Sequence, residues 1–172
     1  EIRERDTAET AIQASLTGHL VLSTLHTNDS SSTITRLLEM GIEPYLISSS
    51  LLACLGQRLI RSICPKCKIN YFAPKLELKE LGVDEDEKIR LSRGKGCSDC
   101  YDSGFKGRTG IFELLKIDEG LRSLILQNPS MDTLQAHLRQ QGHRTLKELG
   151  YEKVLAGDTS LEEIRRATSE ES

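Results

Sequence analysis

Five positions that share one face at helical spacing predict a helix near the start of the chain. They are Ala8, Ala11, Ile12, Ser15 and Leu16. Asp6 and Glu9 imitate a capping box at the start of this helix, and Gly18 can end it. The next segment, 19–25, is a short and nearly continuous apolar run, which is typical of a strand covered on both faces in a parallel sheet. The C-terminal end of that strand delivers His26.

The pattern predicts two further helices and a strand before residue 64. Asp29 can cap the second helix, and Gly41 can end it. The apolar positions of this helix are Ile34, Leu37 and Leu38. A third helix begins at Pro44, and the alternating residues 57–63 predict a strand that runs directly into Cys64.

The middle of the chain is polar, and its later part is helical. A short helix is predicted at 75–81, residues 83–90 are dominated by charge, and 111–117 has the pattern of a strand. Ser160 and Glu163 have the spacing of a capping box. Four helices are predicted after the strand, at 119–127, at 130–141, at 144–156 and beyond Ser160.

The order of these elements predicts an α/β core with an α-helical C-terminal extension, because strands and helices alternate before Cys64 and helices follow residue 118. With 172 residues, the chain is long enough for one ordinary domain, or for one domain with a small appendage. It starts abruptly in structured material at Glu1. We therefore expect it to be a fragment of a longer protein.

Composition argues against two broad classes of function, although a locally basic patch is compatible with it. The formal charge of −3 and the sequence pI near 5.9 give no basic footprint for a strong, nonspecific grip on nucleic acid. No apolar run approaches the roughly 20 residues that span a bilayer, and the N-terminus has no apolar signal-peptide region. We expect a cytosolic protein without a transmembrane segment.

Two C-x-x-C pairs are the most specific chemical signal in the sequence. They are Cys64 with Cys67 and Cys97 with Cys100. Four thiolates form a complete tetrahedral ligand set for Zn²⁺ and leave no open position for a catalytic water, so a structural zinc site is predicted. Unligated thiols or a redox pair are the alternatives. The fifth cysteine, Cys54, lies in an apolar run and is expected to be a small buried side chain.

The cysteines alone also permit a second class of function, a zinc-ribbon adaptor or nucleic-acid-binding module without enzymatic activity. The segment 68–96 between the pairs is longer than the roughly 15 to 20 residues of the commonest short zinc ribbons. Nearby basic residues that could contact a nucleic acid are Lys66, Lys68, Lys106 and Arg108. Because Asp99 and Asp102 are interleaved with them, a solvated surface is the simpler interpretation.

Two histidines flank the predicted strand 19–25. His26 follows its carboxyl end, where α/β folds place ligand-binding side chains, and His19 begins it. The alternative is that either histidine caps a strand or satisfies a local carbonyl group. No phosphate-binding loop of the form G-x-x-x-x-G-K-[ST] is present, because Ile89 and Gly96 occupy required positions around the only Gly-Lys pair.

Taken together, four segments in this order resemble the secretion ATPases that drive type II secretion and type IV pilus assembly. Glu1-Ile2-Arg3-Glu4 resembles the end of the family's Walker B segment, although Glu4 stands where the family usually has Asp. Residues 16–28 match its His box almost letter for letter. The tetracysteine segment with residues 104–113 resembles its zinc-bearing subdomain, and 153–164 resembles its C-terminal signature.

The resemblance implies an architecture in three consecutive segments. Residues 1–63 would be the C-terminal half of a RecA-like (P-loop NTPase) core, 64–107 a tetracysteine zinc-binding subdomain, and 108–172 a strand plus a helical C-terminal subdomain. The resemblance also implies that the parent protein is an ATP hydrolase. This chain, which lacks the Walker A loop, would be inactive alone.

The resemblance further implies roles for individual residues. Glu1 would polarise the attacking water, and His26, with His19 more weakly, would contact the γ-phosphate of the nucleotide. Arg3 would support the nucleotide site by pairing with an acidic neighbour. The implied cofactors are a structural Zn²⁺ on the four cysteines, with ATP and Mg²⁺ in the full-length protein.

The implied partners belong to a membrane-bound machine. The full-length protein would form a homo-hexamer and act on an inner-membrane platform protein and a cytoplasmic adaptor. It would lie in the cytoplasm and associate peripherally with the bacterial inner membrane through these partners. No nucleic acid partner is implied.

Overall fold

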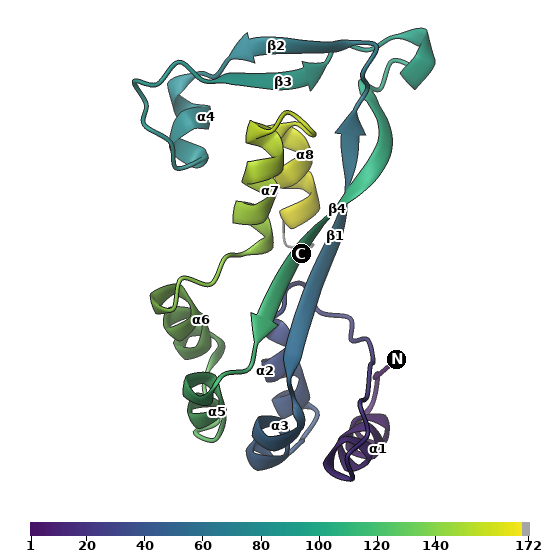
Figure 1. Cartoon of the computed structure of the whole chain (residues 1–172), viewed down its shortest axis with the longest axis vertical. Coiled ribbons are helices and arrows are strands. Elements are labelled where there is room, and N and C mark those ends of the chain that lie inside the picture. The colour runs from purple at the N-terminus through teal and green to yellow at the C-terminus, as the bar shows by residue number, and fades with distance from the viewer. Residues whose placement is uncertain (170–172) are drawn as a thin grey trace. The chain divides into compact units, whose positions relative to one another are not determined.

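The computed structural model describes residues 1–169 (Figure 1). These residues divide into two units, and each unit has its own hydrophobic core. Unit 1 contains Glu1–Gly56 and Glu113–Arg144, and unit 2 contains Gln57–Phe112 with the chain from Thr145 onward. Each unit is therefore built from two stretches that are separated in the sequence. The division into 1–63, 64–107 and 108–172 follows motifs instead of packing, and it stays a prediction.

Two long strands, β1 (Ala53–Ile63) and β4 (Phe105–Lys116), pair with each other in a two-stranded sheet (Figure 1). The strands predicted at 57–63 and 111–117 are confirmed, and both extend further toward their N-terminal ends than the pattern indicated. The second half of β4 alternates strictly between buried and exposed positions. This alternation buries Ile111, Glu113 and Leu115.

Five helices build most of unit 1, and all five confirm predicted helices. They are α1 (Arg5–Leu16), α2 (Ser32–Glu39), α3 (Pro44–Ser50), α5 (Glu119–Ile125) and α6 (Met131–Gln140). α3 contacts α1, α2 and α5, and its fully buried Ile47 belongs to their shared core. The side chain of Asp118 accepts the backbone amide of Leu121 and caps α5, as the side chain of Ser130 caps α6.

The capping box predicted for the first helix is wrong. Helix α1 begins at Arg5, its N-cap residue is Glu4, and no side chain caps it. The carboxylate of Glu9 accepts a hydrogen bond from Nε of Arg5 at 2.6 Å instead of one from a backbone amide. Asp6 lies inside the first turn, where its charge still stabilises the positive end of the helix dipole.

The strand predicted at 19–25 is also wrong, since the structure assigns no regular element there. Leu20 is 76% exposed and Leu22 is 88% exposed. Between residues 1 and 169, no strand pairs with this segment, although the amide of Ile2 donates to the carbonyl of Thr24 at 2.8 Å. An apolar run is typical of a strand whose two faces are packed against other elements. Among the described residues, no element packs over Leu20 and Leu22.

Unit 2 contains a hairpin that the sequence did not predict. β2 (Lys68–Phe72) and β3 (Arg90–Gly94) pair antiparallel, with Lys68 opposite Gly94 and Phe72 opposite Arg90. Helix α4 (Lys75–Glu80) connects them and confirms the helix predicted at 75–81. Helices α7 (Leu146–Leu155) and α8 (Leu161–Thr168) are confirmed, lie side by side and complete the core of this unit (Figure 1).

A buried carboxylate, Glu163 on α8, ties that helix to β1. Its side chain is fully buried and accepts hydrogen bonds from Nη2 of Arg61 and Nη2 of Arg166, each at 2.6 Å, and from the backbone amide of Arg61 at 2.9 Å. The predicted capping box is therefore only half correct. The side chain of Ser160 accepts a hydrogen bond from the amide of Glu163, as predicted. The carboxylate of Glu163, however, bonds to arginines and not to the backbone amide of Ser160.

We expect Glu163→Gln to destabilise the chain at neutral pH but not in acid. Burial alone would raise the pKa of Glu163, but the hydrogen bonds from Arg166 and Arg61 lower it from 4.5 to about 2. A carboxyl group whose folded-state pKa is lowered stabilises the fold above pH 4.5, and this contribution is lost as the pH falls toward 2. The deficit at pH 7 should be about 2 to 3 kcal/mol.

Urea unfolding of both proteins from neutral pH to about pH 3 measures this difference in the free energy of unfolding. Glu162→Gln is the matched control, because Glu162 is the exposed neighbour on the same helix. A deficit that stays constant as the pH falls would show that the charge of Glu163 is not its source.

No helix among residues 1–169 is both long and apolar enough to cross a membrane.

Candidate functional site

The four paired cysteines lie together in unit 2. Cys64 directly follows β1, and Cys67 precedes β2. Cys97 is the N-cap residue of the short 3₁₀ turn η1 (Ser98–Cys100), and Cys100 is its last residue. Their ligand atoms all lie within 4.8 Å of one another. Individual Sγ–Sγ distances are 3.9 Å for Cys64–Cys97, 3.8 Å for Cys67–Cys100 and 3.7 Å for Cys97–Cys100.

These distances fit a tetrahedral metal site. A zinc ion with four Zn–S bonds of about 2.3 Å separates its sulfur ligands by about 3.8 Å, whereas a disulfide would bring two sulfurs to about 2.05 Å. All five cysteines of the chain are free thiols, so none is held in a disulfide. The arrangement therefore suits one Zn²⁺ with a closed coordination sphere.

Backbone amides prepare this cluster for negative charge. Burial raises the pKa of Cys67 to about 11. Burial also opposes ionisation of Cys100, but the amides of Cys97 and Gly104 each lie 3.3 Å from its Sγ, and they lower its pKa from 9.0 to about 7. Cys100 is thus the readier thiolate of the two, and a bound zinc ion would hold all four cysteines in that form.

Two glycines allow the cysteine-bearing stretches to approach each other. A Cβ atom on Gly94 would lie 1.9 Å from the carbonyl oxygen of Gly104, and Gly104 itself has a left-handed φ of +77°. The carbonyl oxygen of Gly104 accepts a hydrogen bond from the amide of Cys64 at 2.9 Å. The amide of Gly104 donates to Sγ of Cys100. A side chain at either glycine would displace backbone that supports the metal ligands.

The lysines beside the cysteines are engaged within the protein. Lys66 donates to Oδ1 of Asp99 at 2.6 Å, and Lys106 donates to Oδ2 of the same carboxylate. The hydrogen bonds from Lys106 and Lys66 hold the pKa of Asp99 below its usual range. This pairing neutralises part of the basic surface on which a nucleic-acid-binding function would depend.

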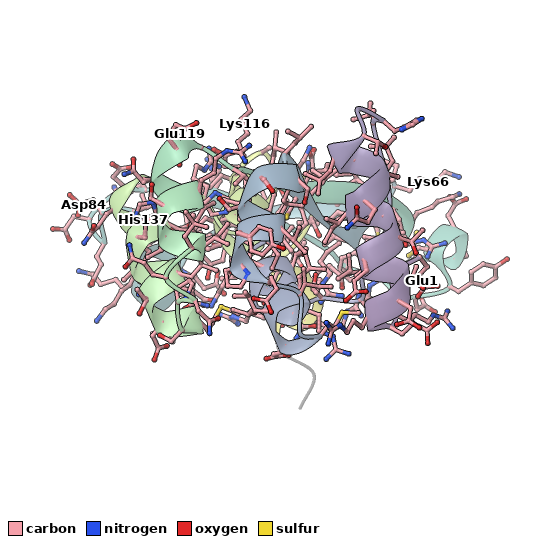
Figure 2. All side chains as sticks on the ribbon, turned by 90° about the horizontal axis from the view of Figure 1, so that it is seen from below. Glu1, Lys66, Asp84, Lys116, Glu119 and His137 are labelled. Carbon is pink, nitrogen blue, oxygen red and sulfur yellow. The ribbon has the colours of Figure 1, made fainter. Side chains whose placement is uncertain are left out.

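A second cluster forms in unit 1 around Glu1, which precedes helix α1 in the sequence and is labelled in Figure 2. Oε1 of Glu1 lies 2.6 Å from Nε2 of His26, and its Oε2 lies 2.7 Å from Nη2 of Arg3. The side chain of Glu1 is 30% exposed, whereas those of Arg3 and His26 are 75% and 85% exposed. The cluster is therefore open to a ligand from solvent.

Arg3 and His26 keep Glu1 ionised. The hydrogen bond from Arg3 outweighs the effect of partial burial and, together with the attraction of His26, lowers the pKa of Glu1 below its ordinary value of 4.5. A carboxylate with a lowered pKa accepts hydrogen bonds throughout the neutral range. It is suited to orienting a water molecule more than to storing a proton.

The structure brings three of the four residues predicted for nucleotide chemistry into contact, and it places His19 elsewhere. Nδ1 of His19 lies 3.3 Å from the carbonyl oxygen of Ala14 and 3.2 Å from Oγ1 of Thr17, at the end of α1. These contacts correspond to the alternative in which a histidine satisfies a local carbonyl group. The roles of Glu1, Arg3 and His26 stay predictions.

One buried carboxyl group of unit 1 was not predicted from the sequence: Glu113 on β4, which is 2% exposed. It contacts Ser30 in the loop that follows His26. A signal for it exists in the sequence, because Glu113 replaces an apolar residue in the alternating pattern between Ile111 and Leu115. A charged residue at a predicted core position indicates either a buried network or a functional site.

Comparison with known proteins identifies relatives over nearly the whole chain. Residues 1–166 match the family model described as "Type II/IV secretion system protein". The chain is 52% identical over 171 residues to the type II secretion system protein E of Pseudomonas aeruginosa, covering 99% of the chain and 34% of that protein. It is 48% identical over 170 residues to the type II secretion system ATPase E of Vibrio cholerae, again covering 99% and 34%.

A relative from pilus assembly is similar to the same degree. The chain is 45% identical over 172 residues to the type IV pilus assembly ATPase PilB of Thermus thermophilus, covering 99% of the chain and 19% of that protein. The chain thus spans 34% or less of the length of these three relatives.

Solved structures show the same fold. The crystal structure of the pilus retraction motor PilT with bound ADP aligns with a TM-score of 0.65 and 25% identity, covering 99% of the chain and 38% of that motor. The ATPase DotB of Legionella pneumophila aligns with a TM-score of 0.61 and 20% identity over 96% of the chain and 36% of DotB. These likenesses confirm the predicted fold class, an α/β fold with a partial RecA-like core.

Proposed function

The chain belongs to the type II/IV secretion system protein family, and from this membership we propose that it is part of a motor ATPase that couples ATP hydrolysis to protein secretion or pilus assembly. The observation that carries the proposal is the 48% identity to an ATPase of type II secretion over 99% of the chain. The family resemblance predicted from the sequence motifs is confirmed by this match. Activity, substrates and partners of the whole protein remain part of the proposal.

In the proposed mechanism, the cluster around Glu1 serves the hydrolysis of the γ-phosphoryl group. The carboxylate of Glu1 orients the attacking water, and its lowered pKa keeps it ionised for that task. His26 bonds to Oε1 of Glu1 and contacts the γ-phosphate. Arg3 bonds to Oε2 and fixes the orientation of the carboxylate. His19 contributes more weakly, from the end of α1.

The proposed cofactors are one zinc ion held by this chain, and ATP with Mg²⁺ held by the whole protein. Zn²⁺ on Cys64, Cys67, Cys97 and Cys100 is structural, because four thiolates leave it no open coordination position. ATP and Mg²⁺ belong to the whole protein, since this chain contains no phosphate-binding loop to hold the β- and γ-phosphates.

The proposed partners follow from family membership alone. The whole protein forms a homo-hexamer and passes work to an inner-membrane platform protein and a cytoplasmic adaptor. It works in the cytoplasm and reaches the inner membrane through these partners. The proposal covers both protein secretion and pilus assembly, because relatives from both machines match the chain at similar identity.

We expect the whole protein to hydrolyse ATP when Mg²⁺ is present, and the isolated 172-residue chain neither to hydrolyse ATP nor to bind it tightly. Phosphate release by both proteins at equal concentration tests this expectation, with omission of Mg²⁺ as the control. Absence of magnesium-dependent turnover by the whole protein would remove the proposed function. Turnover by the chain alone would show that the missing phosphate-binding loop is dispensable.

A further inference from the structure

Glu113 is a buried acidic side chain of unit 1 to which the proposed mechanism gives no part. Its Oε1 accepts hydrogen bonds from the backbone amide of Ser30 at 3.3 Å, from the hydroxyl of Ser30, and from Nε2 of His143 at 3.1 Å. A carboxylate oxygen can only accept, so Nε2 of His143 carries the hydrogen. One carboxylate therefore joins the loop around Ser30 to the connection between α6 and α7, where His143 lies.

Ser30 belongs to the short loop that follows His26, and this loop is held at several points. Oδ1 of Asp29 accepts the amide of Ser32 at 2.7 Å and the hydroxyl of Ser31 at 2.8 Å. Oγ1 of Thr27 donates to the carbonyl of Asp29 at 3.1 Å. These bonds stay within the loop and the first turn of α2. The bonds of Ser30 to Glu113 reach instead to a strand that is distant in the sequence.

A carboxylate at position 113 is costly for the fold. Its neighbours on the same face of β4, Ile111 and Leu115, are 2% and 3% exposed, so a leucine there would suit the alternating pattern. Burying a charge requires partners that offset its lost hydration, and here Ser30 and His143 provide them. An apolar side chain at position 113 would suffice for a stable core. The hydrogen bonds of a buried carboxylate are instead suited to holding a loop in one conformation.

We propose that Glu113 is a positioning residue for His26. It holds Ser30, and through the backbone of residues 26–30 it sets where the imidazole of His26 meets Glu1. This inference rests on the proposed function, because it assigns Glu113 to the nucleotide site without direct contact to the nucleotide. The side chain of His26 is 85% exposed, so its placement depends on the loop that carries it.

The first experiment needs no activity. In the 172-residue chain, Glu113→Gln should shift the ring resonances of His26 in a carbon–proton NMR spectrum, because the neutral carbonyl oxygen of glutamine is a weaker acceptor for these donors than a carboxylate oxygen. Ser30→Ala should shift them in the same way and serves if the first variant folds poorly. Glu163→Gln is the matched control, since Glu163 is an equally buried glutamate in unit 2 that bonds Arg61 and Arg166.

The second experiment measures kcat and KM for ATP in the whole protein. Glu113→Gln should lower kcat by about 10- to 100-fold, the loss expected when a reacting group is misplaced by an ångström or less. Glu163→Gln should lower thermal stability while leaving kcat per folded molecule unchanged. If Glu113→Gln behaves like Glu163→Gln in both experiments, Glu113 is merely structural and the inference is overturned.

The two experiments separate the inference from the function on which it rests. A shift of the His26 resonances together with an inactive wild-type whole protein would support the positioning of His26 and reject the proposed ATPase. An active wild-type protein whose kcat is insensitive to both Glu113→Gln and Ser30→Ala would keep the ATPase and reject the positioning role.

Discussion

Removing zinc from the four-cysteine site is expected to unfold the zinc-bearing part of unit 2 while the core of unit 1 stays folded. β2 has no buried residue, and between the cysteine pairs the core of unit 2 contains only Leu81 and Leu91, with four partly buried residues packed against it. We expect this limited packing to need closure of the segment by the metal. Structural zinc contributes about 10 to 16 kcal/mol of apparent free energy in small zinc-finger peptides, so the expected loss is large.

Elemental analysis and hydrogen exchange measure this effect. Freshly purified, reduced protein should contain about one zinc per chain, as expected for one four-thiolate site. After chelation, amides between residues 64 and 104 should exchange rapidly, whereas helix α3 of unit 1, whose Ile47 lies in the core, should stay protected. The two units have separate cores, and this is the physical reason to expect local instead of global unfolding.

Cysteine-to-serine substitutions identify the source of the effect. Cys64→Ser should lose the metal and its stabilisation, because three thiolates leave the coordination sphere incomplete. Cys54→Ser is the matched control: Cys54 is 6% exposed, but it belongs to the core of unit 1, whereas the four zinc ligands belong to unit 2. Purified wild-type protein without zinc, or a chelated protein with unchanged protection, would contradict the prediction.

The helices were predictable because the signals that define them are local. Periodic apolar residues and a capping side chain lie within a few positions of one another, as Ser130 and Thr145 show at the starts of α6 and α7. The error at Ser160 has the same origin. The spacing to Glu163 identified a capping residue correctly, but it could not show that Arg61, about a hundred positions earlier, competes for the carboxylate.

The strands were less predictable because their partners are distant in the sequence. Pairing of Lys68 with Gly94 requires the chain between them to close, and the polar composition of β2 gives little sign of it. Arg90 and Arg93 lie over the rings of Phe72 and Tyr71, so cation–π contacts across the hairpin replace the apolar alternation by which a strand is recognised.

The residues of the candidate site were predicted from the sequence, but the contacts among them were not. The motifs indicated Glu1, Arg3 and His26 separately. That Glu1 bonds both others with different oxygens depends on the path of the chain after α1, which does not form the predicted strand at 19–25. Glu113 was not predicted because its hydrogen-bond donors, Ser30 and His143, are distant in the sequence. Only the folded chain shows that they lie against this buried carboxylate.

Glu1→Gln in the whole protein is expected to lower kcat for ATP hydrolysis by about 100- to 10,000-fold, the usual range for a positioned acid–base group. Glutamine keeps the size of the side chain but removes its charge, and its amide nitrogen cannot accept from either Arg3 or His26. KM for ATP should change little, since Glu1 is assigned to the attacking water and not to nucleotide binding.

Two measurements distinguish this loss from a general disturbance of unit 1. Glu9→Gln is the control, because Glu9 is a partly exposed glutamate on α1 whose partner is Arg5. The kcat of this variant should match that of the wild type. The pKa of Glu1 lies below 4.5, so the wild-type kcat should show no acidic limb from this group above about pH 5. A Glu1→Gln protein with wild-type kcat would place the water-orienting carboxylate elsewhere, and the Glu1–His26 contact would then be a structural ion pair.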